Sequence, residues 1–139
     1  ASGVTRPLDF ERRLQALRRF LPSDEAKSLA AADKRARNIL RQAGDTPTTI
    51  KPDRFEVPAE HAAIETLQRV ESALAPLRAA RDYGAMLSEL ATLKQPVDAF
   101  FDAVMVMAED AQVRSNRLGL LARLDALCRE VADLSLLPG

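Results

Sequence analysis

The stretch SDEAKSLAAADKRARNILRQAG, from Ser23 to Gly44, decides the fold class of this chain. It begins with a serine, which caps helix N-termini, and two acidic residues follow where the helix dipole favours negative charge. It ends with a glycine, which can adopt the left-handed backbone that stops a helix. With about 100° between successive residues, one side carries only small and aliphatic side chains. These are Leu29, Ala32, Ala36, Ile39, Leu40 and Ala43. The stretch therefore predicts an amphipathic helix that packs this side against a core.

The opposite side of the same predicted helix is cationic. A narrow stripe along the helix, together with the positions on either side of it, comprises Lys27, Lys34, Arg35, Arg37, Asn38 and Arg41. Lysine and arginine suit phosphate groups, and an asparagine amide can both donate to and accept from a base edge. The pattern is typical of an RNA-contacting face, and it is equally typical of an ordinary solvated basic surface. Taken alone, the stripe leaves both interpretations open.

The remainder of the chain also has the pattern of helices, separated by proline and glycine. Alanine, leucine, arginine and glutamate dominate, glycine is scarce, and no strand-like alternation occurs. Apolar residues at spacings of three and four predict further helices over 9–21, from 58 to a kink or end at Pro76, over 83–93, over 97–108, and from a cap at Asp110 through Leu134. The sequence thus predicts an all-α, single helical bundle of roughly six helices.

This predicted bundle occupies residues 8–139, and residues 1–7 are expected to be a linker. A long loop is expected over 44–58, pinned to the core by Ile50 and Phe55. The N-terminus has neither an initiator methionine nor the layout of a signal peptide, so we expect a piece of a longer protein.

Composition and charge limit the classes of protein to which the chain can belong. With 47% apolar and 29% charged residues, the chain fits a soluble globular protein, and no apolar run is long enough for a transmembrane helix. The formal net charge is zero, yet residues 1–44 contain ten Lys/Arg against five Asp/Glu, while the rest contains ten against fifteen. A local basic face is therefore compatible with the neutral total.

Side chains that could perform catalysis are sparse in this sequence. His61 is the single histidine, and together with Glu65 it supplies too few ligands for a metal. Cys128 lies on an apolar face with no histidine nearby, which favours a structural thiol over a nucleophile. Neither a P-loop nor a dinucleotide-binding glycine motif occurs. We therefore expect no catalytic residue and no metal site.

A second informative segment, PVDAFFDAVMVMAEDAQVRSNRLGLL, spans residues 96–121. Its first half is apolar on most sides, which predicts a helix at the centre of the bundle, with Met105 and Met107 in the core. Asp98 follows a proline near the expected helix start, where an acidic residue favours capping.

The second half of this segment contains polar residues near the side of the last helix that is expected to pack against the core. Arg117 falls between core positions, and a buried cation needs a partner, which Asp98, Asp102 or Asp110 could supply. Arg114 and Asn116 are expected to point further outward, where they are candidates for RNA contact.

The segment 96–121 closely resembles a signature near the C-terminus of the bacterial glycyl-tRNA synthetase beta subunit. The block Lys34-Arg35 with Asn38-Ile39-Leu40 and the closing residues 131–135 also resemble that family. The likeness extends from about residue 8 to residue 136 and is weakest over 44–58.

This resemblance implies a fold like the anticodon-binding domain of arginyl-tRNA synthetase and binding of tRNA-Gly, through its anticodon arm. In that family the alpha subunit holds the class II site for glycine and ATP with magnesium. The chain would then be a non-catalytic part of cytoplasmic glycine–tRNA ligase, with no cofactor of its own. Its partners would be tRNA-Gly, the rest of the beta subunit and the alpha subunit, without DNA or a membrane.

Two other functions remain as alternatives. A scaffold that holds the alpha and beta subunits together is favoured if part of the apolar helix 97–108 is exposed, or if a large apolar patch occurs elsewhere. An independent enzyme has neither a nucleophile–base pair nor a cofactor motif in its favour.

Overall fold

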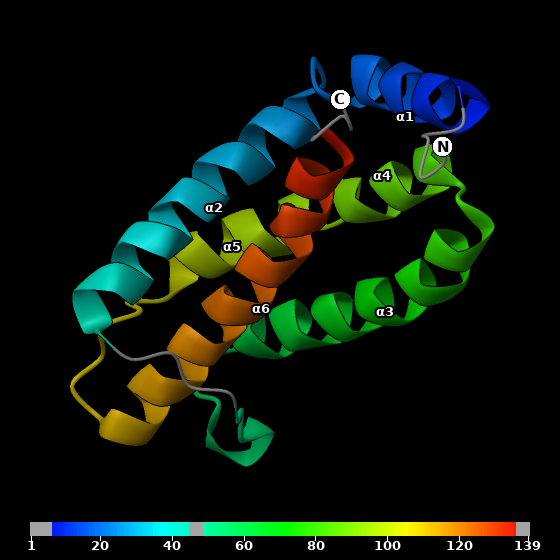
Figure 1. Ribbon diagram of the computed structural model, residues 1–139. Coiled ribbons are helices and arrows are strands. Elements are labelled where there is room, and N and C mark those ends of the chain that lie inside the picture. The colour runs from blue at the N-terminus through cyan, green and yellow to red at the C-terminus, as the bar shows by residue number, and fades with distance from the viewer. Residues whose placement is uncertain (1–6, 45–48, 136–139) are drawn as a thin grey trace.

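The computed structural model describes residues 7–44 and 49–135, which form a bundle of helices (Figure 1). The elements are α1 (Pro7–Phe20), α2 (Asp24–Ala43), the 3-10 helix η1 (Pro52–Arg54), α3 (Pro58–Ala80), α4 (Tyr83–Ala91), α5 (Lys94–Ala103) and α6 (Ala111–Ser135). No strand occurs in these two ranges, and the all-α prediction is confirmed. Residues 1–6 of the expected linker and 45–48 of the expected loop lie outside the described residues.

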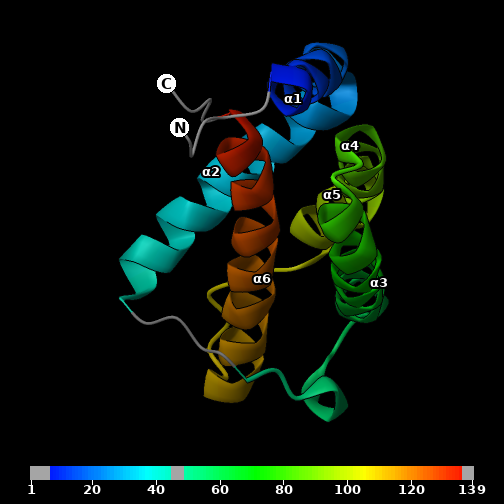
Figure 2. The ribbon, with the colours of Figure 1, turned by 45° about the vertical axis from the view of Figure 1, so that its right-hand side comes forward.

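The last helix, α6, runs lengthwise through the bundle, and the other helices surround it (Figures 1 and 2). α2 packs along one side of α6, α3 to α5 cover another, and α1 crosses one end against α4. Between α3, α5 and α6 the core is built from aliphatic and aromatic side chains, among them Leu67, Phe100, Leu121 and Leu124. The arrangement leaves one long side of α2 facing solvent.

The ends of α2 are those that its sequence predicts. The side chain of Ser23 accepts a hydrogen bond from the backbone N–H of Ala26 at 3.1 Å. At the other end Gly44 has φ 73°, and its N–H donates to the carbonyl of Leu40 at 3.2 Å. Asp110 caps α6 as predicted, because its Oδ1 accepts from Gln112 and Val113. These backbone bonds lower the pKa of the Asp110 carboxyl.

The expected loop over 44–58 contains the short helix η1, and Ile50 and Phe55 pack against the core as predicted. Helix α3, however, does not end at Pro76. It continues to Ala80, and Arg81 ends it with a left-handed φ of 57°.

Helix α5 begins and ends earlier than predicted. It runs from Lys94 to Ala103, because Pro96 fits the first helical turn, where no N–H is needed. Asp98 is therefore not a capping residue; it accepts a hydrogen bond from Lys94 Nζ at 3.0 Å.

The segment after α5 corrects the prediction that Met105 and Met107 lie in the core. Their exposed fractions are 75% and 46%, whereas Val104 and Val106 are buried. The backbone of Val104 is already extended, with φ −124° and ψ 146°. In an extended chain successive side chains point to opposite sides, so the valines take the core and the methionines face solvent.

Candidate nucleic-acid interface

The basic side of α2 is the candidate interface, and it is exposed as the sequence predicts. Its six polar residues all face solvent: Lys27, Lys34, Arg35, Arg37, Asn38 and Arg41. On the other side of the helix, Leu29, Ala32 and Ala36 are buried in the core. The helix is thus anchored by small apolar residues, which hold the cationic face outward. An RNA role for these six residues stays a prediction.

Arg35 is held in place by an aromatic ring. Its Cζ atom lies 4.5 Å from the ring centroid of Phe101, which is partly buried at the end of α5. A cation over an aromatic face is attracted by the ring quadrupole, so this contact fixes the direction of the guanidinium. The edge of the cationic face is therefore attached to α5 as well as α2.

Arg129 of α6 extends the cationic face beyond α2, next to Arg37. Arg37 Nε lies 3.2 Å from Asp33 Oδ2 and 4.0 Å from Asp125 Oδ1, while Arg129 Nη2 lies 2.9 Å from Asp125 Oδ2. The sequence prediction missed Arg129, although its spacing of four residues from Asp125 on one helix was a local signal for the pair.

An open hollow of about 350 Å³ lies between α2 and α6 at this point. It is lined by Arg37, Leu40, Arg41, Ala122, Asp125, Ala126 and Arg129. The walls combine three guanidinium groups and the carboxylate of Asp125 with small or aliphatic side chains.

Two carboxyl groups meet at the contact of α2 with α6. The exposed fraction of the Asp125 side chain is 8% and that of Asp33 is 14%. Burial, followed by the neighbouring carboxyl group of Asp125 and its charge, raises the pKa of Asp33 to about 7. Arg37 and Arg129 act in the opposite direction. Burial beside this pair also raises the pKa of Cys128 to about 12, so the thiol stays protonated near neutral pH.

Asn116 is not an outward RNA-contacting residue, and this part of the prediction is wrong. The residue is fully buried; its Oδ1 accepts from Lys51 N at 2.8 Å and its Nδ2 donates to Lys51 O at 2.9 Å. The amide thus completes the backbone hydrogen bonding of the segment before η1. Arg114 is partly exposed and donates to the carbonyls of Ala108 and Glu109, so an RNA role for it stays a prediction.

Arg117 is buried, as predicted, but its partners are not the predicted ones. Its Nε lies 3.2 Å from Glu60 Oε2, its Nη1 donates to Met105 O at 2.7 Å, and its Nη2 lies 3.4 Å from Glu56 Oε1.

The predicted partners Asp98 and Asp102 are wrong, because Asp98 binds Lys94 and Asp102 is exposed on α5. Asp110 caps α6 instead. Glu60 also accepts from the N–H groups of Glu56 and Val57, so it caps α3 and neutralises Arg117 at once. Its place two residues after Pro58, in the first turn of a helix, was the sequence signal for the first of these roles.

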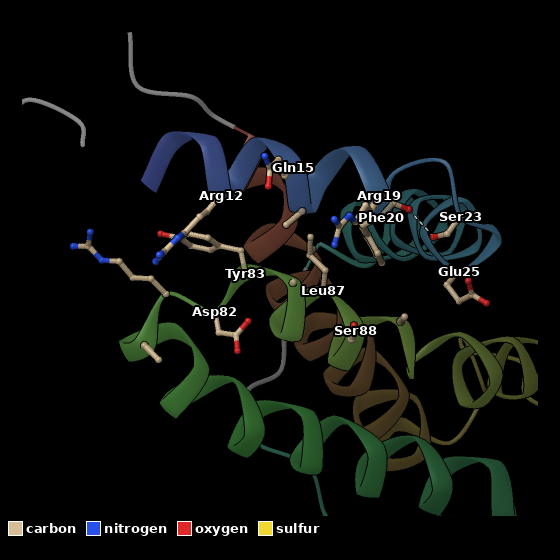
Figure 3. Close-up of a pocket in the computed structure, with 15 residues that line it drawn as sticks. Arg12, Gln15, Arg19, Phe20, Ser23, Glu25, Asp82, Tyr83, Leu87 and Ser88 are labelled. Carbon is tan, nitrogen blue, oxygen red and sulfur yellow. Dashed lines mark hydrogen bonds between the residues drawn. The ribbon is translucent and has the colours of Figure 1, made fainter. Parts of the chain in front are cut away.

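A larger open hollow of about 760 Å³ lies between α1 and α4 (Figure 3). Arg12 and Arg19 project into it from α1, and Tyr83 and Asp82 border it from the start of α4. The Tyr83 hydroxyl donates to Asp9 at 2.6 Å, and the lining carries charges of both signs.

The described residues contain no group of three His, Cys, Asp or Glu side chains that could hold a metal ion. His61 packs instead edge-on against the Phe55 ring, with 4.9 Å between the centroids. None of the helices in the described part of the chain is long and apolar enough to cross a membrane.

These features define a helical bundle that presents an arginine-rich face. Residues 29–134 match the DALR anticodon binding domain, and the chain belongs to this family. The resemblance noted from the sequence is thereby confirmed.

Particular relatives carry the name glycine–tRNA ligase beta subunit. The chain is 49% identical to that protein of Aeromonas salmonicida (strain A449) over 99% of its own length and 20% of the relative. It is 48% identical to that of Ectopseudomonas mendocina (strain ymp) with the same coverage, and 48% to that of Acinetobacter baylyi over 96% of this chain and 19% of the relative. The chain spans about a fifth of the length of these curated relatives.

Proposed function

We propose that this chain binds tRNA-Gly through the anticodon arm, as a non-catalytic part of glycine–tRNA ligase in the cytoplasm. The observation that carries the proposal is the cationic face of α2, exposed along its length and held outward by its buried side, in a DALR anticodon binding domain. Arginine and lysine on that face would contact phosphates, and the Asn38 amide would be available to a base edge.

In this proposal the domain contributes binding energy far from the reacting atoms. Contacts to the anticodon arm would orient the tRNA so that its acceptor end reaches the active site of the alpha subunit. Glycine, ATP and magnesium belong to that site, and this chain needs no cofactor of its own. The rest of the beta subunit and the alpha subunit would be its protein partners.

The test is the triple variant Lys34→Ala, Arg35→Ala, Arg41→Ala, titrated with tRNA-Gly at several salt concentrations. Each lost phosphate contact should lower the salt dependence, so we expect affinity to fall roughly tenfold or more and the slope of log affinity against log salt to decrease by about 2. Fluorescence anisotropy measures both quantities.

A matched control is the triple variant Arg12→Ala, Arg18→Ala, Arg19→Ala, which removes three exposed arginines of α1. This control should retain most of the affinity, and circular dichroism should show both variants to be helical. Salt-independent binding by the wild type, or wild-type affinity of the α2 variant, would exclude the proposed face.

A second candidate function is assembly with other parts of the ligase. The exposed side chains of Met105 and Met107 favour it, because large apolar groups in solvent commonly mark contact surfaces. Replacing both with glutamine should weaken association with the alpha subunit, measured by analytical ultracentrifugation, while tRNA affinity stays unchanged.

A further inference from the structure

We propose that the hollow between α2 and α6 is a phosphodiester-binding site, in which Arg37, Arg41 and Arg129 hold one backbone phosphate of a bound RNA. The inference rests on the proposed function and deepens it. It adds α6 to a surface that the sequence pattern confines to α2.

The three arginines retain donors for an incoming anion. The side chains of Arg37 and Arg129 are 55% and 73% exposed, although each also contacts a carboxylate of the buried pair. A guanidinium has five N–H donors, so binding one carboxylate through one edge leaves another edge free. Arg41 is exposed, and no carboxylate of the described residues lies within 4.0 Å of it.

The guanidinium groups that line the hollow suit a phosphate group. The hollow, of about 350 Å³, is also bordered by Leu40, Ala122 and Ala126, whose side chains offer no hydrogen bonds, and by the carboxylate of Asp125, whose exposed fraction is 8%. The planar fork of arginine matches two phosphate oxygens at once. In the proposal, guanidinium groups of two helices hold one phosphate in the hollow that they line.

The carboxyl pair at the edge of this hollow can adjust its charge. Asp33 Oδ1 and Asp125 Oδ1 are both buried and neither has a hydrogen-bond partner. One proton shared by the pair would satisfy both oxygens, because a protonated carboxyl donates and the other accepts. The charged and titratable groups that face the pair are Arg37 on α2, and Arg129 and Cys128 on α6.

Proton uptake and anion binding should therefore reinforce each other. With both carboxyls ionised, the three arginines and the pair carry one net positive charge; a shared proton leaves two. An entering phosphate favours the protonated pair, and the raised pKa of Asp33, about 7, places this exchange near neutral pH. Affinity for RNA should rise as the pH falls through that value.

The first experiment compares Arg129→Gln with wild type by anisotropy titration of tRNA-Gly with the 139-residue chain. We expect roughly fivefold weaker binding and a salt slope smaller by about 1, because one phosphate contact is lost. Arg78→Gln is the matched control. Arg78 lies on α3, outside the hollow, and pairs with Glu130 of α6, the helix that carries Arg129. This variant should bind like wild type.

The second experiment uses Asp33→Asn, whose amide can donate to Asp125 at any pH and thereby imitates the protonated acid. Wild-type affinity should fall roughly two- to fivefold between about pH 6 and about pH 8, while Asp33→Asn should keep the tight, low-pH affinity throughout. Asp102→Asn, at an exposed position on α5, should retain the wild-type pH profile.

The outcomes separate the two proposals. If the α2 triple variant loses affinity while Arg129→Gln keeps the wild-type affinity and salt slope, the phosphate site is overturned and the tRNA-binding function stands. If Asp33→Asn retains the wild-type pH dependence, the coupling of the carboxyl pair to the site is overturned. Absence of tRNA binding by the wild type would overturn both.

Discussion

Two contacts of α6 bury charged groups, and they satisfy these charges in opposite ways. At the N-terminal part of α6, Arg117 meets the carboxylate of Glu60 and the carbonyl of Met105, so opposite charges and complementary hydrogen bonds lie together. Nearer the C-terminus, Asp33 and Asp125 place like charges side by side. The first contact pairs its charges within the core, whereas the second depends on a proton and on exposed arginines.

The two contacts therefore have different roles in the protein. The Glu60–Arg117 contact fixes the start of α3 and the segment after α5, and each nitrogen of the buried guanidinium has a partner within the protein. The Asp33–Asp125 contact lies next to the cationic face and borders an open hollow. We expect the first to govern stability and the second to govern how the face responds to pH.

The largest effect is expected from Glu60→Gln, which leaves the Arg117 guanidinium buried without its nearest carboxylate. Loss of one partner of a buried ion pair should lower the free energy of unfolding by about 3 kcal/mol. Urea denaturation followed by circular dichroism measures it. Glu65→Gln, at an exposed position of the same helix, should change it little; equal stability of the two variants would contradict a supporting role for Glu60.

A smaller effect is expected from Asn116→Ala, which removes both hydrogen bonds to the backbone of Lys51. The loss should be about 2 kcal/mol, because a buried amide partner is removed and the backbone groups lose their bonds. Hydrogen exchange should show the Lys51 amide exchanging faster. Unchanged exchange at Lys51, with Gln68→Ala at an exposed position of α3 as the reference variant, would show that the Asn116 amide does not hold this segment.

The smallest effect concerns the carboxyl pair and the pH dependence of stability. Folded Asp33 keeps its proton up to about pH 7, whereas in the unfolded chain it releases the proton near its ordinary value of 3.8. The folded state therefore binds more protons between these values, and the free energy of unfolding falls as the pH rises through this window.

Asp33→Asn should abolish that contribution, so the difference between variant and wild type should grow by about 1 kcal/mol between about pH 5 and about pH 7, after allowance for screening by water and the arginines. Urea denaturation at both pH values measures the difference, and Asp102→Asn is the control. A difference that stays constant with pH would contradict the raised pKa.

Local sequence signals predicted α2 well, because its structure depends on residues close together in the chain. A serine cap, small apolar residues at helical spacing and a terminal glycine each act within one or two turns. The exposure of the cationic residues then follows from the burial of the opposite side. Family resemblance added the RNA-binding interpretation, which the residue pattern alone left open.

The segment 96–117 could not be predicted in the same way, since its structure is decided by distant residues. Alternating valine and methionine suit a buried helix and a half-buried extended chain equally, so the sequence did not locate the end of α5 at Ala103. The pattern predicts that Arg117 is buried and needs a carboxylate partner, but it does not identify that partner. Glu60 fills that need from 57 positions earlier in the chain.

The adjacent residues Asn116 and Arg117 have a consequence for the order of folding. Their bonds to Lys51 and Glu60 join residues 65 and 57 positions apart, so both ends of a large loop must be ordered before either bond forms. We expect the helices to associate first and these two contacts to form after the transition state. Weakening them would then mainly accelerate unfolding and leave the folding rate nearly unchanged. The two contacts would then set the unfolding rate, and with it the lifetime of the native state.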